Sequence, residues 1–197
     1  MSATPIDISA TEGAWRLPSR GRVGMLCLIL AESAIFTIFI AAYIFYIGKS
    51  LSGPTPQQIL TVPIFTSIGL WLSSFTIHWA VSALAKGKTA VFAGLWFVTL
   101  ALGAAFIAGT AREWHHLIYN EGFTIQTNLF GTTYYSLVGL HASHVIIGLI
   151  ALTTVMIFAL LGKVKPEHHE RCEVLSLYWH FVDIVWVVVF IVVYGLR

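Results

Sequence analysis

Three groups of ionisable residues lie inside long apolar stretches of this sequence. His141 and His144 are three residues apart, His180 and Asp183 are also three apart, and Glu32 stands alone. Residues three apart on a helix project from one face, so each pair can meet a partner helix. Ionisable groups in hydrocarbon are rare and usually serve a function or pair with one another. These five residues are therefore the first candidates for a functional site.

The histidines allow two kinds of chemistry. Neutral imidazole is the commonest metal ligand, and b-type haems are held between histidines on facing helices. Gly139 and Gly148 lie close to His141 and His144 and would leave space for a macrocycle. The alternative is that the histidines and Asp183 hydrogen-bond between helices and stabilise packing. We favour packing, because complete ligand sets are rare, and so expect neither a metal site nor a catalytic residue.

Glu32 has two interpretations of equal weight. A protonatable acid near the middle of a membrane can relay protons. It can also remain a neutral carboxylic acid that donates a hydrogen bond to a neighbouring helix. His78 is expected nearer the inner membrane edge, and the polar groups of the different spans could share one layer.

The composition indicates the class of protein that must hold these residues. Of its 197 residues, 57% are apolar and only 10% are charged, and the mean hydropathy is +0.82. Such values are far from those of soluble domains and are typical of an integral membrane protein. The formal net charge of +2 is spread over loop ends, so nucleic acid is not an expected partner.

The sequence predicts an all-α polytopic membrane protein, a bundle of five transmembrane helices. A membrane span needs about 20 apolar residues. A polar segment, residues 1–22, precedes a single domain over residues 23–197, and the first helix is expected to serve as the insertion signal. The predicted spans are residues 23–47, 60–84, 89–111, 129–161 and 174–194.

The basic residues predict the orientation of the helices, since cytoplasmic loops carry the excess of lysine and arginine. One side of the predicted bundle carries most of them: Arg16, Arg20, Arg22, Lys86, Lys88, Lys163, Lys165 and Arg171. The other side carries Lys49, Arg112 and Arg197. We therefore expect a cytoplasmic amino terminus and a carboxyl terminus on the outer, periplasmic side.

Several ordered motifs resemble subunit III of the haem-copper terminal oxidases, the cytochrome c and quinol oxidases. Residues 25–33, MLCLILAES, are similar to the helix that carries the family's membrane-embedded, carbodiimide-reactive glutamate, which would be Glu32. The other matching segments are LGAAF at 102–106, EW at 113–114, FGTTYY at 130–135, GLHASHVIIG at 139–148 and YWHFVDIVW at 178–186. The resemblance extends from about residue 21 to the end of the chain.

The resemblance implies a subunit without its own cofactor, in a complex that reduces dioxygen to water and pumps protons. Haem and copper would belong to partner subunits, and bound phospholipid is expected here. The main partner would be subunit I, with subunit II and small subunits or a supercomplex as further contacts. Glu32 would have a role in proton uptake or lipid contact, while His78, His141, His144, His180 and Asp183 would form a structural polar network or contact lipid.

Longer members of this family have seven helices, whereas five fit here, and the missing two would be the amino-terminal pair. Five-helix forms are familiar among bacterial oxidases, which implies a multi-pass protein of a bacterial inner membrane. Three alternatives stay open: a haem-binding membrane cytochrome using His141 or His144 with His180, a proton-coupled transporter built around Glu32, and an accessory subunit of a nitric oxide reductase. The absence of sequence repeats weakens the transporter hypothesis.

Overall fold

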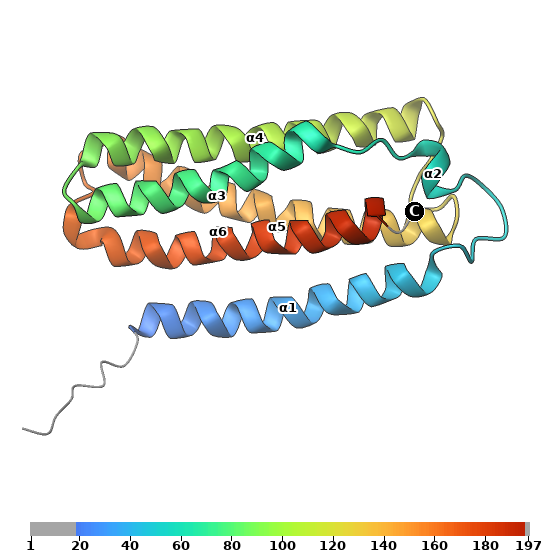
Figure 1. Ribbon diagram of the computed structural model, residues 1–197, viewed down its shortest axis with the longest axis horizontal. Coiled ribbons are helices and arrows are strands. Elements are labelled where there is room, and N and C mark those ends of the chain that lie inside the picture. Colours follow the sequence, from blue (N-terminus) through green and yellow to red (C-terminus); the bar gives the residue numbers. More distant parts are fainter. Residues whose placement is uncertain (1–18, 196–197) are drawn as a thin grey trace, which may run out of the picture.

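The computed structural model describes residues 19–195, and this part of the chain forms helices and no strand. Predictions that concern residues 1–18, including Arg16, and Arg197 fall outside the described residues. Figure 1 shows long helices that run side by side, with a short helix in the connection that follows the first. The helices are α1 (Arg20–Tyr46), α2 (Pro56–Ile59), α3 (Ile64–Ala85), α4 (Thr89–Tyr119), α5 (Leu129–Leu160) and α6 (His169–Phe190).

Five of the described helices are long and apolar enough to cross a membrane, which confirms the predicted all-α class and the number of spans. The observed helix boundaries differ from the predicted spans mainly at two places. Helix α4 continues to Tyr119, because the polar residues after Ala111 extend it without a break. Helix α6 begins at His169, follows a short 3-10 turn (Pro166–His168), and ends in a π-helical turn (Ile191–Gly195).

The helix ends follow from local sequence. Gly162 has a φ of +67°, and the N–H of Lys163 donates to the carbonyl of Phe158 at 2.9 Å, which closes the end of α5. Asn128 begins α5: its Oδ1 accepts a hydrogen bond from the N–H of Gly131 at 2.8 Å. Its Nδ2 donates to the carbonyls of Ser52 and Pro54, each at 3.2 Å, which ties the α1–α3 connection to α5.

Helices α5 and α6 form the centre of the bundle. Helix α6 packs against α1, α3 and α5, while α5 packs against α1, α4 and α6. Helices α3 and α4 form the most extensive pair, and α1 lies on the other side of α5 and α6 (Figure 1). Of the five spans α6 is the most buried and α1 the least, so most of the α1 surface faces outward.

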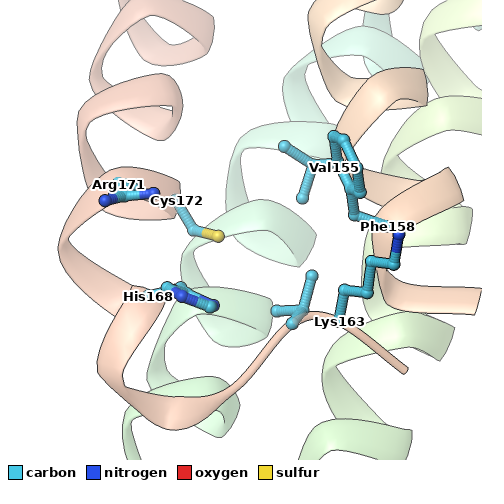
Figure 2. A pocket seen from close by; sticks show the side chains of 7 residues that line it. Val155, Phe158, Lys163, His168, Arg171 and Cys172 are labelled. Carbon is cyan, nitrogen blue, oxygen red and sulfur yellow. The ribbon is translucent and has the colours of Figure 1, made fainter. Parts of the chain in front are cut away.

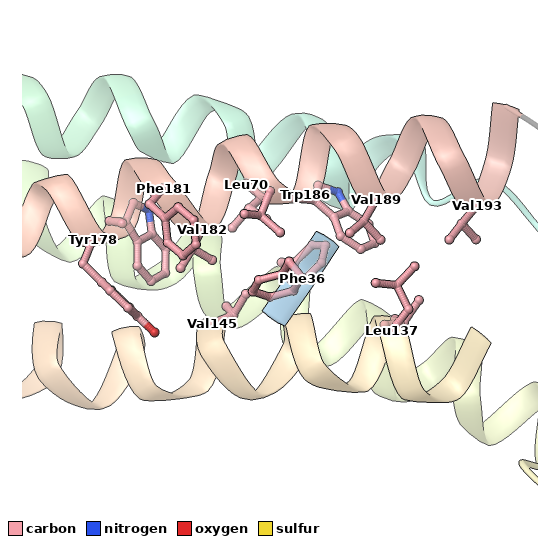
Figure 3. Close-up of a cluster of buried hydrophobic side chains, with 14 of the residues drawn as sticks. Phe36, Leu70, Leu137, Val145, Tyr178, Phe181, Val182, Trp186, Val189 and Val193 are labelled. Atoms are coloured by element: carbon pink, nitrogen blue, oxygen red, sulfur yellow. The ribbon is translucent and has the colours of Figure 1, made fainter. Parts of the chain in front are cut away.

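The core between α5 and α6 is apolar and aromatic. Figure 3 shows Phe181, Val182, Trp186 and Val189 of α6 above α5, with Phe36 of α1 entering the same cluster. Burial of such side chains is worth about 1.5–3 kcal/mol each in water, but in a membrane close packing takes over much of this role.

Small residues allow the closest helix contacts. The indole ring of Trp179 lies where a Cβ on Gly103 of α4 or on Gly148 of α5 would come within 2.9 Å of its atoms. Its Nε1 donates to Oγ of Ser73 on α3 at 2.7 Å. One side chain of α6 therefore contacts three other helices, and glycine is required at both facing positions.

The described basic residues gather at one end of the bundle, hereafter the basic end. This end holds the start of α1, the α3–α4 turn and the α5–α6 turn (Figure 1). Its basic residues are Arg20, Arg22, Lys86, Lys88, Lys163, Lys165 and Arg171. The opposite end holds Lys49 and Arg112.

Candidate functional site

Glu32 and His144 form a polar pair between α1 and α5. Oε2 of Glu32 lies 3.1 Å from Nε2 of His144, and Nδ1 of the same ring lies 2.8 Å from the carbonyl oxygen of Leu140. Residue 140 is one turn before His144 on the same helix, so the backbone of α5 fixes the orientation of the ring. The pair is thus built from one α1 side chain and one preset α5 side chain.

This geometry allows one proton to lie between the two side chains. The carbonyl of Leu140 can only accept a hydrogen bond, so Nδ1 of His144 carries a hydrogen and donates it. A neutral His144 then accepts through Nε2 from a protonated Glu32, and an imidazolium donates through Nε2 to a carboxylate. In either state one proton would lie between Nε2 and Oε2.

The surroundings of the pair are mostly apolar. The side chain of His144 is 9% exposed and that of Glu32 is 23% exposed, so the acid is the more exposed of the two. The ring of Phe36 lies 4.9 Å from the His144 ring, measured between centroids. The hydroxyl of Tyr178 donates to the carbonyl of His144 at 3.1 Å, and Tyr178 points toward α5 in Figure 3. The acid on α1 is thus the more accessible member of the pair.

Asp183 and His180 belong to a second cluster, between α3 and α6. Oγ of Ser74 donates to Oδ2 of Asp183 and lies 3.1 Å from Nδ1 of His180. Ser74 therefore connects the two residues. Residues three apart on a helix point outward side by side, and here they meet through a third residue on the partner helix.

His78 extends this cluster to the basic end. A pocket of about 290 Å³ between α3 and α6 is lined by His78 and His180, together with His169, Glu173 and Ser176. It lies beside the ion pair in which Arg22 of α1 is 2.5 Å from Glu173. Several polar side chains therefore meet at this pocket among the helix ends, whereas the pair of Glu32 and His144 lies deeper along the helices.

His141 is separate from both clusters. It is fully buried and stacks on Trp186, with ring centroids 4.8 Å apart and an interplanar angle of 25°. The ring of Phe106 meets it edge-on at 5.7 Å. Neither ring nitrogen has a hydrogen-bond partner within residues 19–195. The structure thus divides the six predicted site residues into one pair, one Ser74-centred cluster and one aromatic pocket.

The haem hypothesis requires space that the structure fills with tryptophan. A Cβ at Gly148 would lie 2.9 Å from the Trp179 ring, and one at Gly139 would lie 3.3 Å from the Trp114 ring. Both nitrogens of His144 are engaged, as described above. Among the described residues no group of three or more histidine, cysteine or acidic side chains is arranged to hold a metal ion.

Sequence reasoning missed two sets of polar contacts. Serines of α3 accept hydrogen bonds from tryptophans of α6: Trp179 donates to Ser73, and Trp186 donates to Ser67 at 3.0 Å. The seven-residue spacing of the tryptophans was the available signal, since this spacing keeps one helix face.

Glu113 of α4 is the other omission. It is half-buried and accepts from the hydroxyl of Tyr194 at 3.3 Å and from that of Tyr134 at 3.5 Å. In the sequence it lies between Arg112 and Trp114 near two histidines, a pattern typical of a solvated helix end. The tyrosines that bind it are 21 and 81 residues away, so no local pattern indicates the contact.

The sequence was compared with known proteins. Residues 17–196 match the family Cytochrome c oxidase subunit III. The chain is 37% identical to cytochrome c oxidase subunit 3 of Synechocystis sp., over 90% of this chain and 76% of the relative. It is 36% identical to a probable cytochrome c oxidase subunit 3 of Nocardia farcinica (91% and 90%), and 35% identical to a cytochrome bo(3) ubiquinol oxidase subunit 3 of Pseudomonas putida (87% and 84%). The chain, with its five membrane-spanning helices, therefore belongs to the cytochrome c oxidase subunit III family.

Proposed function

We propose that this chain is the non-catalytic subunit III of a respiratory haem-copper oxidase that reduces dioxygen to water and pumps protons. Its contribution to the complex is to stabilise subunit I, to bind lipid and to support proton uptake. Membership of the family supports the association with other oxidase subunits. Subunit II and smaller subunits, or a supercomplex, are further contacts in this proposal.

The observation that carries the proton role is the 3.1 Å contact between Oε2 of Glu32 and Nε2 of His144. An acid and an imidazole that share a proton can accept or release one with little movement of heavy atoms. Because Glu32 is the exposed member, exchange takes place from the α1 side. The pair thus acts as a buffer for protons at mid-depth of the bundle and does not take part in oxygen chemistry.

The stabilising and lipid-binding roles are supported by the outer surface of α1. Large apolar side chains on this helix are exposed: Leu26, Leu28, Leu30, Ile35, Ile38 and Phe45. A surface of this kind inside a membrane contacts lipid chains or the apolar surface of another subunit. Redox centres belong, in this proposal, to the partner subunits, and His141, His144 and His180 stabilise packing.

The test compares Glu32→Gln with Glu121→Gln in the complete oxidase complex. Glutamine keeps the size of Glu32 and can donate an N–H to Nε2 of His144, but it has no proton to transfer. Glu121 lies in the exposed α4–α5 connection and controls for removal of an acid. We expect Glu32→Gln to keep the haem content and initial oxidase rate but to shorten the catalytic lifetime severalfold or to lower the number of protons pumped per electron.

Two results would contradict the proposal. If Glu32→Gln removed the haem from the complex, the chain would have a part in holding a redox centre. If both variants had the wild-type lifetime and pumping stoichiometry, the shared proton would have no role in turnover. Retention of the subunit is checked by gel analysis of each purified complex.

A further inference from the structure

The two ends of the bundle differ in what lies between their helices. At the basic end, a pocket of about 290 Å³ lies between the end of α5 and the start of α6, and Val155 and Phe158 are part of its apolar wall (Figure 2). At the opposite end, the helices meet through one carboxylate and two phenols: Oε1 of Glu113 accepts from the hydroxyls of Tyr134 and Tyr194. The proposed function does not use these three residues, hereafter the outer-end cluster.

The outer-end cluster joins three elements. Glu113 belongs to α4, Tyr134 to α5 and Tyr194 to the π-helical turn (Ile191–Gly195) after α6. Such π turns are rare and frequently occur at functional sites. Both tyrosines are buried, and within residues 19–195 the carboxylate has no ion pair. The negative charge of the carboxylate is therefore met by two phenol O–H groups.

A series of aromatic rings runs from the cluster into the core. Trp186, Phe190 and Tyr194 follow one another at intervals of four residues, which keeps them on one side of the helix. The Tyr194 ring lies 5.3 Å from the Phe190 ring, and that ring lies 6.3 Å from the Trp186 ring, measured between centroids. Trp186 lies among the buried side chains between α5 and α6 (Figure 3). The inner end of the series is thus a core tryptophan.

A second series of rings runs from the cluster toward the α4–α5 connection. The Tyr134 ring lies 5.2 Å from the Tyr135 ring, which lies 5.2 Å from that of Trp114. The Phe123 ring in the connection lies 5.6 Å from the Tyr135 ring. All these distances are typical of aromatic pairs in contact. Between the two series, the carboxylate of the cluster bridges the two tyrosine hydroxyls.

The cluster has the chemical parts of a redox-active tyrosine. Tyrosine and tryptophan lose one electron more readily than the other aromatic side chains, and an electron tunnels readily between rings in contact. A phenol that has lost an electron becomes a strong acid, so its oxidation is favoured where a base within hydrogen-bond reach takes the proton. The Glu113 carboxylate can only accept, and its contacts of 3.3 Å with Tyr194 and 3.5 Å with Tyr134 are of the kind that tightens when charge develops.

We propose that Tyr134 and Tyr194 are a redox-active pair that takes up one-electron oxidising equivalents from the core, with Glu113 as the proton acceptor. One electron passes from a phenol to an oxidised Trp186, the phenol O–H bond breaks, and the proton forms an O–H bond on Oε1 of Glu113. The products are a neutral tyrosyl radical, a carboxylic acid and a restored tryptophan. A reduced metal centre of the complex returns one electron to the radical, and the proton goes back to the phenol oxygen.

The tyrosine pair goes beyond the proton role proposed above, since it uses neither Glu32 nor His144. Only its oxidant rests on the proposed function: a partially reduced oxygen species, formed where the complex reduces dioxygen, gains the electron that Trp186 loses. The pair then protects the core by moving the oxidising equivalent to the outer end. A photochemical oxidant needs no oxygen reduction, so failure of the radical site and failure of the proposed function can be told apart.

The experiment generates such an oxidant beside the cluster in the complete oxidase complex. With Cys27→Ser, a ruthenium polypyridyl group is attached through Glu121→Cys, two residues before Phe123, whose ring is in contact with Tyr135. Light and a soluble electron acceptor convert the group to a one-electron oxidant, and electron paramagnetic resonance records the radical that forms. The same complex without Glu121→Cys gives the background.

The test variant is Tyr134→Phe with Tyr194→Phe, which keeps both rings and removes the hydroxyls. The matched control is Tyr46→Phe with Tyr119→Phe, two exposed tyrosines at the same end. We expect a long-lived tyrosyl radical in the wild type and the control, and only background in the test variant. Each single change in the pair should also lower the yield, so the result does not depend on assembly of the double variant. A wild-type signal in the test variant, or its loss in the control, would overturn the proposal.

The role of the carboxylate is tested with Glu113→Gln, which keeps the size of the side chain but removes the proton acceptor. We expect a severalfold lower radical yield, and a partial recovery with Glu113→Asp, which restores a carboxylate. Equal yields in Glu113→Gln and the wild type would overturn the assignment of the proton acceptor.

A second measurement tests the assigned oxidant. During turnover with added hydrogen peroxide, mass spectrometry measures the conversion of Trp186 to kynurenine. We expect severalfold more conversion in Tyr134→Phe with Tyr194→Phe than in the wild type or the control. Unchanged conversion would overturn the link with oxygen chemistry, while the photochemical result decides the radical site itself.

Discussion

The two acids among the predicted site residues, Glu32 and Asp183, have different partners. We therefore expect their replacement to have different effects. Glu32 meets an imidazole that can exchange a proton with it, while Asp183 meets the hydroxyl of Ser74, which cannot act as a base at neutral pH. Glu32 is therefore suited to proton chemistry and Asp183 to helix packing.

The first prediction concerns the coupling of Glu32 to His144. We expect Glu32→Gln, His144→Gln and the double variant to shorten the catalytic lifetime of the complex by a similar factor, because each change removes the same shared proton. The measurement is the decay of oxygen consumption during continuous turnover. A double variant whose effect equals the product of two independent effects would show that the two side chains act separately.

The second prediction concerns Asp183 and Ser74. Asp183→Ala leaves the Ser74 hydroxyl without its acceptor and should loosen α3 from α6 by about 1–2 kcal/mol. Asp183→Asn keeps an acceptor oxygen and should have a smaller effect. The readout is the temperature at which the subunit dissociates from the complex in mild detergent, with the exposed Glu170→Ala as control. An equal loss for alanine and asparagine would mean that the negative charge itself is required.

At this scale the sequence identified the acids and histidines but not their partners. The cost of an ionisable group in hydrocarbon makes Glu32 or Asp183 conspicuous in a single sequence. The choice of partner depends on how two helices are rotated and shifted against each other, and Ser74 is one of many serines in apolar stretches. Glu113 was missed for the opposite reason, because its charged neighbours are typical of solvated residues.

At the scale of the elements, α6 is the helix on which the others assemble. Trp179 packs against glycines of α4 and α5 and hydrogen-bonds to α3, while Phe36 of α1 joins the aromatic cluster around Trp186. The contact depends on the missing side chains of the two glycines as much as on the indole ring.

The third prediction tests this contact with one methyl group. Gly148→Ala places a Cβ 2.9 Å from the Trp179 ring, whereas Gly94→Ala places one in open space on α4. We expect the first change to lower stability by about 1–3 kcal/mol. The second should leave stability unchanged or raise it, because alanine favours a helix over glycine. Thermal release of the subunit measures both, and equal behaviour of the two variants would refute the close contact.

Apolar length predicted the five spans well, since hydrophobic stretches of this length have few other stable arrangements. The polar residues 112–117 also indicate that the third span continues as a helical end up to Asn120, and α4 does extend to Tyr119. The early start of α6 was not predicted, because it lies beyond the apolar stretch, where capping and helix propensity set the boundary and hydropathy gives no signal.

At the scale of the whole molecule, charge separates the two ends of the bundle. The basic end carries most of the described lysines and arginines, while the opposite end holds Lys49, Arg112 and the acids Glu113 and Glu121. This asymmetry predicts that the basic end faces the cytoplasm.

The fourth prediction tests that orientation by chemical labelling. The native Cys27 is exposed on α1 and is replaced by serine, while Cys172 is buried. In this background Glu121→Cys should react with a membrane-impermeant maleimide on cells whose cytoplasmic membrane is intact. Lys88→Cys should react only after the membrane is opened. The reverse pattern would place the amino end outside.

The arrangement of α1 has a consequence for biosynthesis. Helices α3 and α4 are joined by a short turn and can associate as soon as both have left the ribosome. Helix α1 instead packs against α5 and α6, whose sequences are translated last. Helix α1 therefore waits in the bilayer, with Glu32 and Arg22 lacking their final contacts, until the carboxyl-terminal helices arrive. Completion of the bundle is thus limited by its most distant pairing in the chain, and a nascent subunit remains open to early proteolysis until synthesis is finished.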